Sequence, residues 1–246
     1  YLIFNKWNKK SAMRYLKETG TNLLPLVDNK KKVIDYLKWE DLITSSNNFK
    51  KINRNIDAVI MAGGKGTRLN PISKILPKPL IPVNGVPFIN IILDNFKKAG
   101  IKKFKITINY KSLLLKSYFK EYSKDIKISI FEEKKPLGTI GSLYNLKKKL
   151  SDIFILSNCD TLIDTSLSNI INYHKEKKND LTIVAAIRDF KLPYAYCNVS
   201  KSGDLIKMVE KPEYNFLINT GFYVLNKKVL NIIPKNKFYN FDDFIQ

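Results

Sequence analysis

Residues 62–69 read Ala-Gly-Gly-Lys-Gly-Thr-Arg-Leu, and this stretch decides the fold. It follows residues 56–61, an apolar run with the length and composition of a buried strand. Three glycines within four positions let backbone amides approach a phosphate chain without side chains in the way, and Lys65 and Arg68 add cationic donors. The pattern therefore predicts a phosphate-binding loop directly after a buried strand.

Two better-known phosphate-binding loops have a different pattern. A Walker loop needs Gly-x-x-x-x-Gly-Lys-Ser/Thr, which residues 62–69 do not contain. A dinucleotide-binding fold needs a third glycine, where this chain has Leu69. It also needs an acid at the end of the second strand, where this chain has Asn109 and Tyr110.

Strands and helices alternate around and after this loop. The apolar pattern predicts strands at residues 56–61, 104–109, 126–131 and 153–156, and helices at residues 87–99, 113–121 and 138–150. Such alternation is typical of an α/β fold with a mostly parallel, Rossmann-like sheet and helices on both faces. In such folds, ligands bind at the carboxyl ends of the strands.

Residues 1–53 follow another pattern. We expect a short helix around residues 11–16, strands at residues 22–28 and 32–37, and a helix that starts near residue 39. Leu-Pro-Leu-Val-Asp at residues 24–28 and Asp-Leu-Ile further on resemble the later half of a CBS motif, pairs of which often bind adenine nucleotides. The resemblance implies a partial CBS-like α+β segment that holds a regulatory nucleotide. A role in packing or in forming a homo-oligomer is equally open.

Composition limits the function further. Cys159 and Cys197 are the only cysteines and His174 is the only histidine, which excludes a disulfide framework, common zinc sites and most Ser-His or Cys-His hydrolases. A reducing cytoplasm is the expected location. No apolar run approaches the roughly 18 residues that a membrane span needs. The net charge of +21 is spread along the whole chain, which favours a solvated basic surface over a nucleic-acid site.

A second motif lies close to the loop. Residues 77–83 read Pro-Lys-Pro-Leu-Ile-Pro-Val and fix Lys78 in a rigid, extended stretch. A cation at a fixed distance from a phosphate loop suits phosphoryl chemistry, in which catalysis is mostly positioning and charge neutralisation.

The loop, the Pro-Lys-Pro segment and Asn-Gly-Val-Pro at residues 84–87 together resemble the signature of the sugar-1-phosphate nucleotidyltransferases, which have a GT-A-like fold. The likeness runs from about residue 57 onward and implies a nucleotidyltransferase domain over residues 54–246. It implies that Arg68 stabilises the pentacovalent α-phosphate and that Lys78 holds the phosphates of both substrates. The loop residues that would bind the nucleotide are Ala62, Gly63, Gly64, Gly66 and Thr67.

Residues 132–142, Glu-Glu-Lys-Lys-Pro-Leu-Gly-Thr-Ile-Gly-Ser, carry the predicted base contact. In the resembling family the Leu-Gly-Thr turn, here with Gly138 and Thr139, lies against the nucleoside, and an upstream acid or amide contacts the base. A carboxylate can accept hydrogen bonds from N1–H and N2–H of guanine, which favours GTP. An extra lysine leaves open whether Glu132 or Glu133 makes this contact; we take Glu133 as the candidate.

Residues 156–160, Leu-Ser-Asn-Cys-Asp, end a strand in an acid. A carboxylate there is well placed to hold Mg²⁺, which prefers one or two carboxylates plus phosphate oxygens. The resemblance makes Asp160 the metal ligand and Asn158 a contact of the sugar phosphate. Cys159 stands where the family has glycine, and without an adjacent base it is no nucleophile. The family's second metal aspartate has no match, so we expect it beyond residue 246.

The sugar side of the site is implied by three later segments. Residues 192–196 resemble the family's Pro-Tyr-Gly segment, with Ala195 in place of the glycine. Val-Glu-Lys-Pro at residues 209–212 implies that Glu210 accepts hydrogen bonds from sugar hydroxyls and that Lys211 binds the sugar's phosphate. Asn219, in the strand at residues 218–225, would reach the sugar.

The resemblance thus implies a Mg²⁺-dependent guanylyltransferase of bacterial surface-sugar synthesis, with legionaminic acid synthesis among the pathways. Its substrates would be GTP and glucosamine-1-phosphate, mannose-1-phosphate or heptose-1-phosphate. Two alternatives stay open. One is a nucleotide-sensing regulatory homologue that has lost catalysis, and the other is nucleic-acid binding driven by the net charge.

Overall fold

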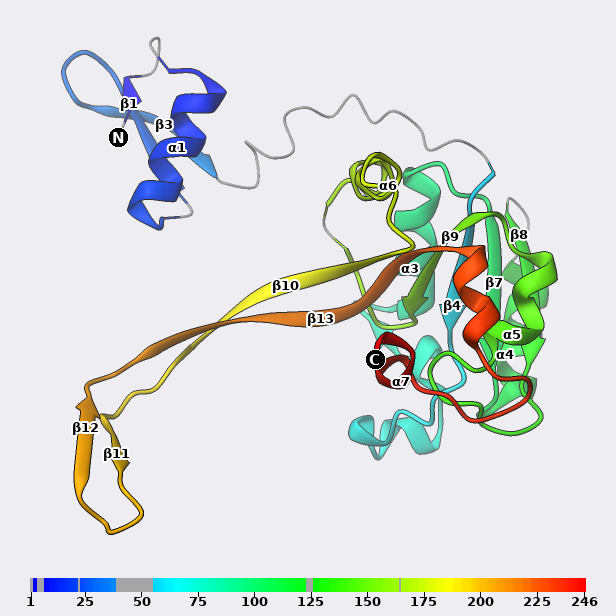
Figure 1. Cartoon of the computed structure of the whole chain (residues 1–246). Coiled ribbons are helices and arrows are strands. Elements are labelled where there is room, and N and C mark those ends of the chain that lie inside the picture. The colour runs from blue at the N-terminus through cyan, green and yellow to red at the C-terminus, as the bar shows by residue number, and fades with distance from the viewer. Residues whose placement is uncertain (1, 4–6, 22, 39–54, 123–125, 164) are drawn as a thin grey trace.

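The computed structural model describes residues 2–3, 7–21, 23–38, 55–122, 126–163 and 165–246 (Figure 1). The bounds of its elements match most of the predicted strands and helices closely. None of the described helices combines the length and the apolar character that a membrane span requires.

The amino-terminal residues form a small sheet with one helix. Its elements are β1 (Leu2–Ile3), α1 (Lys9–Thr19), β2 (Leu23–Val27) and β3 (Val33–Lys38), in the sheet order β1-β2-β3. Asn8 caps α1 by accepting a hydrogen bond from the Ser11 amide at 2.9 Å, and Leu16 and Leu24 are buried together. The predicted helix and two strands are confirmed. The following helix, the linker and the 53/54 boundary lie outside the described residues, so the CBS-like assignment stays a prediction.

A six-stranded sheet organises the rest of the chain, in the order β10-β13-β9-β4-β7-β8. The four strands β9, β4, β7 and β8 are parallel, whereas β13 and β10 run antiparallel to them. The predicted mostly parallel α/β sheet is therefore confirmed. The bounds are β4 (Asp57–Met61), β7 (Lys103–Ile108), β8 (Lys127–Glu132), β9 (Ile153–Asn158), β10 (Leu181–Lys191) and β13 (Glu213–Asn226).

Helices cover both faces of this sheet, as the alternation of its side chains requires. In β4, Ala58 and Ile60 face one core and Val59 faces the other. The first core is covered by α3 (Phe88–Lys98), α4 (Ser112–Tyr122) and α6 (Leu167–Glu176). The second is covered by α5 (Leu143–Leu146), the 3₁₀ helix η6 (Lys227–Ile232) and α7 (Phe241–Ile245).

One predicted helix begins later than expected. The prediction placed it at residues 138–150, but α5 starts at Leu143 and a 3₁₀ turn, η5 (Lys147–Lys149), completes it. The amides of Ile140 and Gly141 instead donate to the carbonyl of Tyr239, at 3.1 and 3.2 Å. These long-range hydrogen bonds replace the first helical turn, so the prediction was wrong for residues 138–142.

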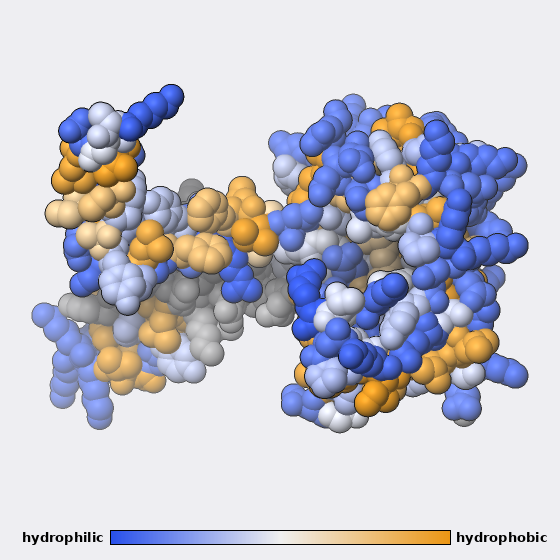
Figure 2. Space-filling view, turned by 90° about the horizontal axis from the view of Figure 1, so that it is seen from below, coloured by the Kyte–Doolittle hydropathy of each residue, from blue (hydrophilic) through white to orange (hydrophobic). Residues whose placement is uncertain are grey.

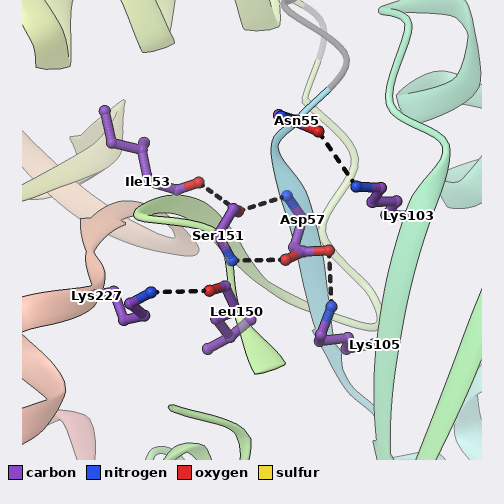
Figure 3. Close-up of polar contacts among 8 residues, drawn as sticks. All are labelled: Asn55, Asp57, Lys103, Lys105, Leu150, Ser151, Ile153 and Lys227. Atoms are coloured by element: carbon purple, nitrogen blue, oxygen red, sulfur yellow. Dashed lines mark hydrogen bonds and ion pairs between the residues drawn. The ribbon is translucent and has the colours of Figure 1, made fainter. Parts of the chain in front are cut away.

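A polar network built around one buried ion pair joins three parallel strands near their amino ends (Figure 3). Lys105 Nζ of β7 lies 2.7 Å from Asp57 Oδ1 of β4, and the two residues are 9% and 4% exposed. The other oxygen of Asp57 accepts a hydrogen bond from the Ser151 amide at 2.7 Å, and the Ser151 hydroxyl donates to the carbonyl of Ile153 in β9. This network fixes the sheet at the edge opposite the glycine-rich loop.

Residues 185–219, here called the arm, leave the sheet as a two-stranded ribbon (Figure 1). Only residues 222–226 of β13 pair with β9, while from the pair Ala185–Asn219 onward β10 and β13 pair with each other alone among the described residues. The strands β11 (Tyr196–Val199) and β12 (Leu205–Val209) form the far end. The sequence predicted a strand within β13 but not the arm.

Candidate active site

A cavity of about 520 Å³ opens at the carboxyl ends of the four parallel strands. Its lining includes Met61 from β4, Thr107 from β7, Glu133 after β8 and Asn158 from β9. The chain order of the strands reverses at β4, and such a switch point leaves a crevice between neighbouring loops. The cavity therefore lies where an open α/β sheet is expected to bind its ligand.

The glycine-rich loop forms one wall of this cavity. Gly63, Gly64, Gly66, Thr67 and Arg68, all predicted to act on the nucleotide, line it. Ala62 does not: it is 1% exposed, and its amide donates to the carbonyl of Thr107 at 2.8 Å. Ala62 thus anchors the loop to β7 rather than facing a ligand.

The structure shows why a glycine stands at position 66. Its φ of +63° is a left-handed conformation that side chains rarely adopt. A Cβ at this position would also lie 3.2 Å from the Cβ of Lys78. Gly66 therefore lets the loop pack directly against the segment that carries Lys78.

The cationic side of the cavity is built from Lys78 and Arg68. Lys78 begins the 3₁₀ helix η4 (Lys78–Leu80) and forms an ion pair with Asp160, which follows β9. Both partners are partly exposed and line the cavity. Arg68 also lines it, and no carboxylate among the described residues pairs with its guanidinium. A polyphosphate in the cavity would therefore meet Arg68, which no described carboxylate holds, and Lys78, which Asp160 already holds in position.

The structure distinguishes the two neighbouring acids at the end of β8. Glu132 is exposed and forms an ion pair of 2.5 Å with Lys116, whose hydrogen bond lowers the pKa of that carboxyl group. Glu133 lines the cavity, where its Oε2 accepts a hydrogen bond from the Leu137 amide at 3.2 Å. Burial raises the pKa of Glu133. Of this pair, only Glu133 lines the cavity, so it remains the candidate for the base contact.

The turn that follows Glu133 packs against the carboxyl-terminal residues. Gly138, with a φ of +79°, lies so close to this segment that a Cβ would come within 2.5 Å of the Tyr239 carbonyl oxygen. The Thr139 hydroxyl accepts a hydrogen bond from the Phe241 amide at 2.7 Å. Gly138 and Thr139, the predicted nucleoside contacts, line the cavity.

Sequence reasoning missed the residues that the carboxyl-terminal segment adds to the lining, Phe238 and Asn240. Asn240 caps α7 in a capping box with Asp243. The local pattern of Asn followed by Asp three positions later could have indicated this helix start. No local sequence pattern connects Asn240 to the turn at residues 138–139, about a hundred positions earlier. Its position at the cavity could therefore not be inferred from the sequence.

Asp160 could hold a divalent cation. The described residues contain no cluster of three or more His, Cys, Asp or Glu side chains, so an ion at Asp160 would take its other ligands from substrate and water. Mg²⁺ fits this donor set, because it usually binds one or two carboxylates together with phosphate oxygens. The neighbouring Cys159 is buried, which raises the pKa of its thiol to about 12. Burial therefore disfavours the thiolate form of this side chain.

Three of the predicted sugar contacts do not line the cavity. Glu210 and Lys211 lie on the arm, between β12 and β13, where their side chains are exposed and 3.8 Å apart. Asn219 lies at the base of the arm, where Nδ2 donates to the Tyr223 hydroxyl at 2.8 Å and Oδ1 accepts from the Gly221 amide at 3.0 Å. The fourth predicted contact, Asn158, does line the cavity.

The arm is nevertheless attached beside the cavity. The hydroxyl of Thr161, the residue after Asp160, donates to the carbonyl of Thr220 at 2.7 Å. Thr220 lies in an irregularity where the pairing shifts from Val184–Phe222 to Ala185–Asn219. The base of the arm is thus tied to the segment that carries the candidate metal ligand.

Comparison with known proteins gives matches over most of the chain. Residues 57–246 match the family model described as Nucleotidyl transferase. The D-glycero-alpha-D-manno-heptose 1-phosphate guanylyltransferase of Campylobacter jejuni is 35% identical over 195 residues, which cover 78% of this chain and 85% of that protein. A mannose-1-phosphate guanylyltransferase of Mycobacterium tuberculosis is 30% identical over 186 residues, which cover 74% of this chain but only 52% of that protein.

Solved structures give a similar result. HddC from Yersinia pseudotuberculosis, solved in complex with GMP-PN, matches with a TM-score of 0.60 and 29% sequence identity. The match covers 76% of this chain and 83% of that one.

Proposed function

Because the chain belongs to the nucleotidyl transferase family, we propose that it transfers a guanylyl group from GTP to a sugar-1-phosphate and releases pyrophosphate. Family membership confirms the nucleotidyltransferase predicted from the sequence. The guanine base, the sugar and the use of Mg²⁺ are our proposals.

One observation carries the proposal: residues from separate segments meet around a single cavity. The loop residue Arg68, the proline-flanked Lys78 and the strand-end Asp160 all line it, together with Glu133. This arrangement offers backbone amides and cations to a triphosphate, and a carboxylate on the side where a base would lie. These four residues are among those that the sequence motifs implied, whereas Ala62, Glu210, Lys211 and Asn219 do not line the cavity.

The chain's residues support an in-line displacement. An oxygen of the sugar-1-phosphate attacks the α-phosphorus of GTP, and the bond from that phosphorus to the oxygen bridging to the β-phosphate breaks. Arg68 and Lys78 stabilise the charge that develops on the phosphoryl oxygens, while the loop holds the triphosphate in place. Mg²⁺ bound at Asp160 would neutralise further phosphate charge.

Glu133 supports the choice of GTP. Its carboxylate can accept hydrogen bonds from N1–H and N2–H of guanine, and no adenine or uracil edge offers this pair of donors. A hypothetical Cβ at Gly63 would lie 3.7 Å from Glu133 Oε1, so the carboxylate lies beside the phosphate loop. Two curated relatives carry the word guanylyltransferase in their names, which also supports GTP.

The sugar is proposed from the relatives rather than from the cavity. Their names specify heptose 1-phosphate and mannose-1-phosphate, so these two are the first substrates to test. Glucosamine-1-phosphate is the third. We place the product in bacterial surface-sugar synthesis as part of this proposal, with legionaminic acid synthesis as the pathway for the amino sugar.

A pyrophosphate-release assay tests the proposal. Each of the four ribonucleoside triphosphates is combined with each of the three sugar-1-phosphates, with and without Mg²⁺. We expect turnover with GTP and one of the sugars, and none when Mg²⁺ is chelated. The absence of turnover with every pair would reject the enzymatic proposal.

The position of Glu210 and Lys211 favours a second candidate. With these residues away from the cavity, the chain could bind a nucleotide without turning it over, as a nucleotide-sensing homologue. Binding of GTP measured by calorimetry, without pyrophosphate release for any sugar, would identify this role.

A further inference from the structure

A second cavity, of about 640 Å³, opens at the amino ends of β4, β7 and β8, the edge of the sheet opposite the candidate active site. None of the described residues lines both cavities. The lining of this amino-edge cavity contains two aspartates, Asp57 and Asp152, and six lysines, which together give a net charge of +4. The lysines are Lys103, Lys105, Lys127, Lys148, Lys149 and Lys175.

Positive charge alone does not mark a site on so basic a chain. Figure 2 shows hydrophilic side chains over most of the visible face of the part built on the six-stranded sheet. In the amino-edge cavity, however, both acids are already bonded. Asp57 pairs with Lys105 and accepts from the Ser151 amide, and Asp152 lies 2.9 Å from Lys227, which is outside the lining. The five other lysines of the lining have no carboxylate partner among the described residues.

Two of these lysines are held beside each other by the sheet. Lys103 of β7 and Lys127 of β8 are partners in the parallel register, on strands about 4.8 Å apart. Like charges at such positions repel and destabilise the pairing. Lys103 Nζ donates only to the neutral Asn55 side chain among the described residues, at 3.3 Å, and both Lys103 and Lys105 reach from β7 towards β4 (Figure 3). An unfavourable pair of this kind is typical of functional sites, where a ligand compensates it.

The chemistry of the lining favours a small phosphate-bearing anion. A lysine ammonium group binds phosphate as a point charge with three donors, so several lysines can share one multiply charged ligand. The half-buried Ser129, two positions after Lys127, and the Asn55 side chain add neutral polar groups. The volume lies in the range of about 300–1,000 Å³ that small-molecule sites occupy. A nucleic-acid duplex carries its phosphates on a convex cylinder and cannot enter a concave site of this size.

We propose that the amino-edge cavity binds a small anion that carries two or more phosphate charges. Lys103 and Lys127 hold the anion from the sheet, while Lys148 and Lys175 contact it from the segment before β9 and from α6. The bound anion joins these four elements and stabilises the edge at which the chain enters the sheet. The site uses no residue of the candidate active site and does not depend on the proposed function.

Thermal melts without divalent cations test whether the wild-type chain binds such an anion. The probes are inorganic pyrophosphate, a free anion, and mannose-1-phosphate, which carries its phosphate on an organic group. Sodium chloride of equal ionic strength is the reference. At about five times its Kd, a bound probe should raise the melting temperature by about 2–4 °C. A larger rise with one probe identifies the source of the phosphate, and no rise with either overturns the proposal.

Calorimetry with pyrophosphate on three variants locates the binding. Lys103→Gln with Lys127→Gln should weaken binding about tenfold or more, because two charged contacts are lost. Lys201→Gln with Lys207→Gln is the matched control, since it removes the same charge from exposed positions of the arm and should bind as the wild type does. Arg68→Ala alters the candidate active site and should retain the amino-edge binding. Equal weakening in the control pair, or loss of binding in Arg68→Ala, overturns the proposal.

Two further measurements separate the site from an effect on folding. Lys175→Gln lies on α6 rather than on the sheet and should also weaken pyrophosphate binding. Because the sheet variant relieves repulsion between Lys103 and Lys127, its melting temperature in chloride should be no lower than that of the wild type. A clearly lower value contradicts the repulsion from which the site is inferred. A DNA duplex that displaces pyrophosphate from the wild type would replace the small anion by nucleic acid and reject the proposal.

Discussion

Lys78 and Asp160 form an ion pair although 82 positions separate them in the chain. Lys78 follows the glycine-rich loop and Asp160 follows β9, so the pair spans the carboxyl edge of the sheet. Both side chains remain partly exposed to the cavity. Each charge is therefore held in place before a substrate arrives, which reduces the reorganisation that the transition state requires.

Replacing Lys78 by Ala should lower kcat by about 10²–10³-fold, because an oriented charge at the phosphoryl group is removed. The melting temperature should change little, since a partly exposed ion pair contributes about 0–1 kcal/mol to stability. Pyrophosphate release and a thermal melt measure both effects. Lys97→Ala is the matched control, because Lys97 pairs with Asp94 on α3. Equal losses in the two variants would contradict the role of Lys78.

Glu133→Gln should weaken the use of GTP. The amide can accept only one of the two guanine hydrogen bonds, so kcat/KM for GTP should fall about 10–100-fold, the usual effect of losing a charged hydrogen bond. Glu132→Gln is the matched control, because Glu132 pairs with Lys116 and does not line the cavity. Steady-state kinetics with each variant decide between the two acids. A larger effect at Glu132 would reverse our assignment.

We expect the KM for GTP to depend on pH through the carboxyl group of Glu133. Burial raises the pKa of Glu133, and only its ionised form accepts both guanine hydrogen bonds. The KM for GTP should therefore rise as the pH falls towards this raised pKa, and Glu133→Gln should remove that rise. A pH profile of KM for the two proteins measures the difference.

Local sequence patterns predicted the elements that depend on local physics. The apolar runs placed β4, β7, β8 and β9 to within about two residues, because buried parallel strands are continuous apolar stretches. Glycines and prolines identified the loop and the Lys78 segment. Glycine permits backbone conformations that other residues rarely adopt and proline fixes φ, so both effects can be recognised from residue type alone.

Long-range features could not be predicted in this way. The hydrogen bonds from Ile140 and Gly141 to Tyr239 join positions about a hundred residues apart, and they shortened a helix that the apolar pattern indicated. The pairing of Lys105 with Asp57 depends on which strands are neighbours. The arm depends on where β13 stops pairing with β9, which no single segment encodes.

The stability of the fold should fall as the pH drops below about 6.5. Burial lowers the pKa of His174, whose Nδ1 lies 2.9 Å from the Thr182 hydroxyl. The unfolded chain then binds a proton more readily than the folded one, so this contribution is fully present above the unfolded pKa and is lost as the pH falls through the folded pKa. Urea unfolding at pH 7.5 and pH 5.5 should show the loss. Since His174 is the only histidine, His174→Gln should reduce it.

Lys105→Met should destabilise the protein by about 3–5 kcal/mol, because it leaves the buried carboxylate of Asp57 without its cation. Lys103→Met, two positions earlier on the same strand, should change stability by about 0.5 kcal/mol or less, since Lys103 is exposed and bonds only the Asn55 side chain among the described residues, at 3.3 Å. Denaturant unfolding gives both values. Similar values for the two variants would show that the buried pair does not fix the sheet edge.

The arm differs in charge from the rest of the chain, because its five basic and four acidic residues contribute only +1 to the net charge of +21. At about 0.15 M salt the screening length falls to about 8 Å, so the attraction of the basic surface to any polyanion weakens. Apolar contacts made by exposed arm side chains such as Ile187 and Leu217 are not screened in this way. Ionic strength should therefore weaken the binding of polyanions to the basic surface and leave apolar contacts of the arm unchanged.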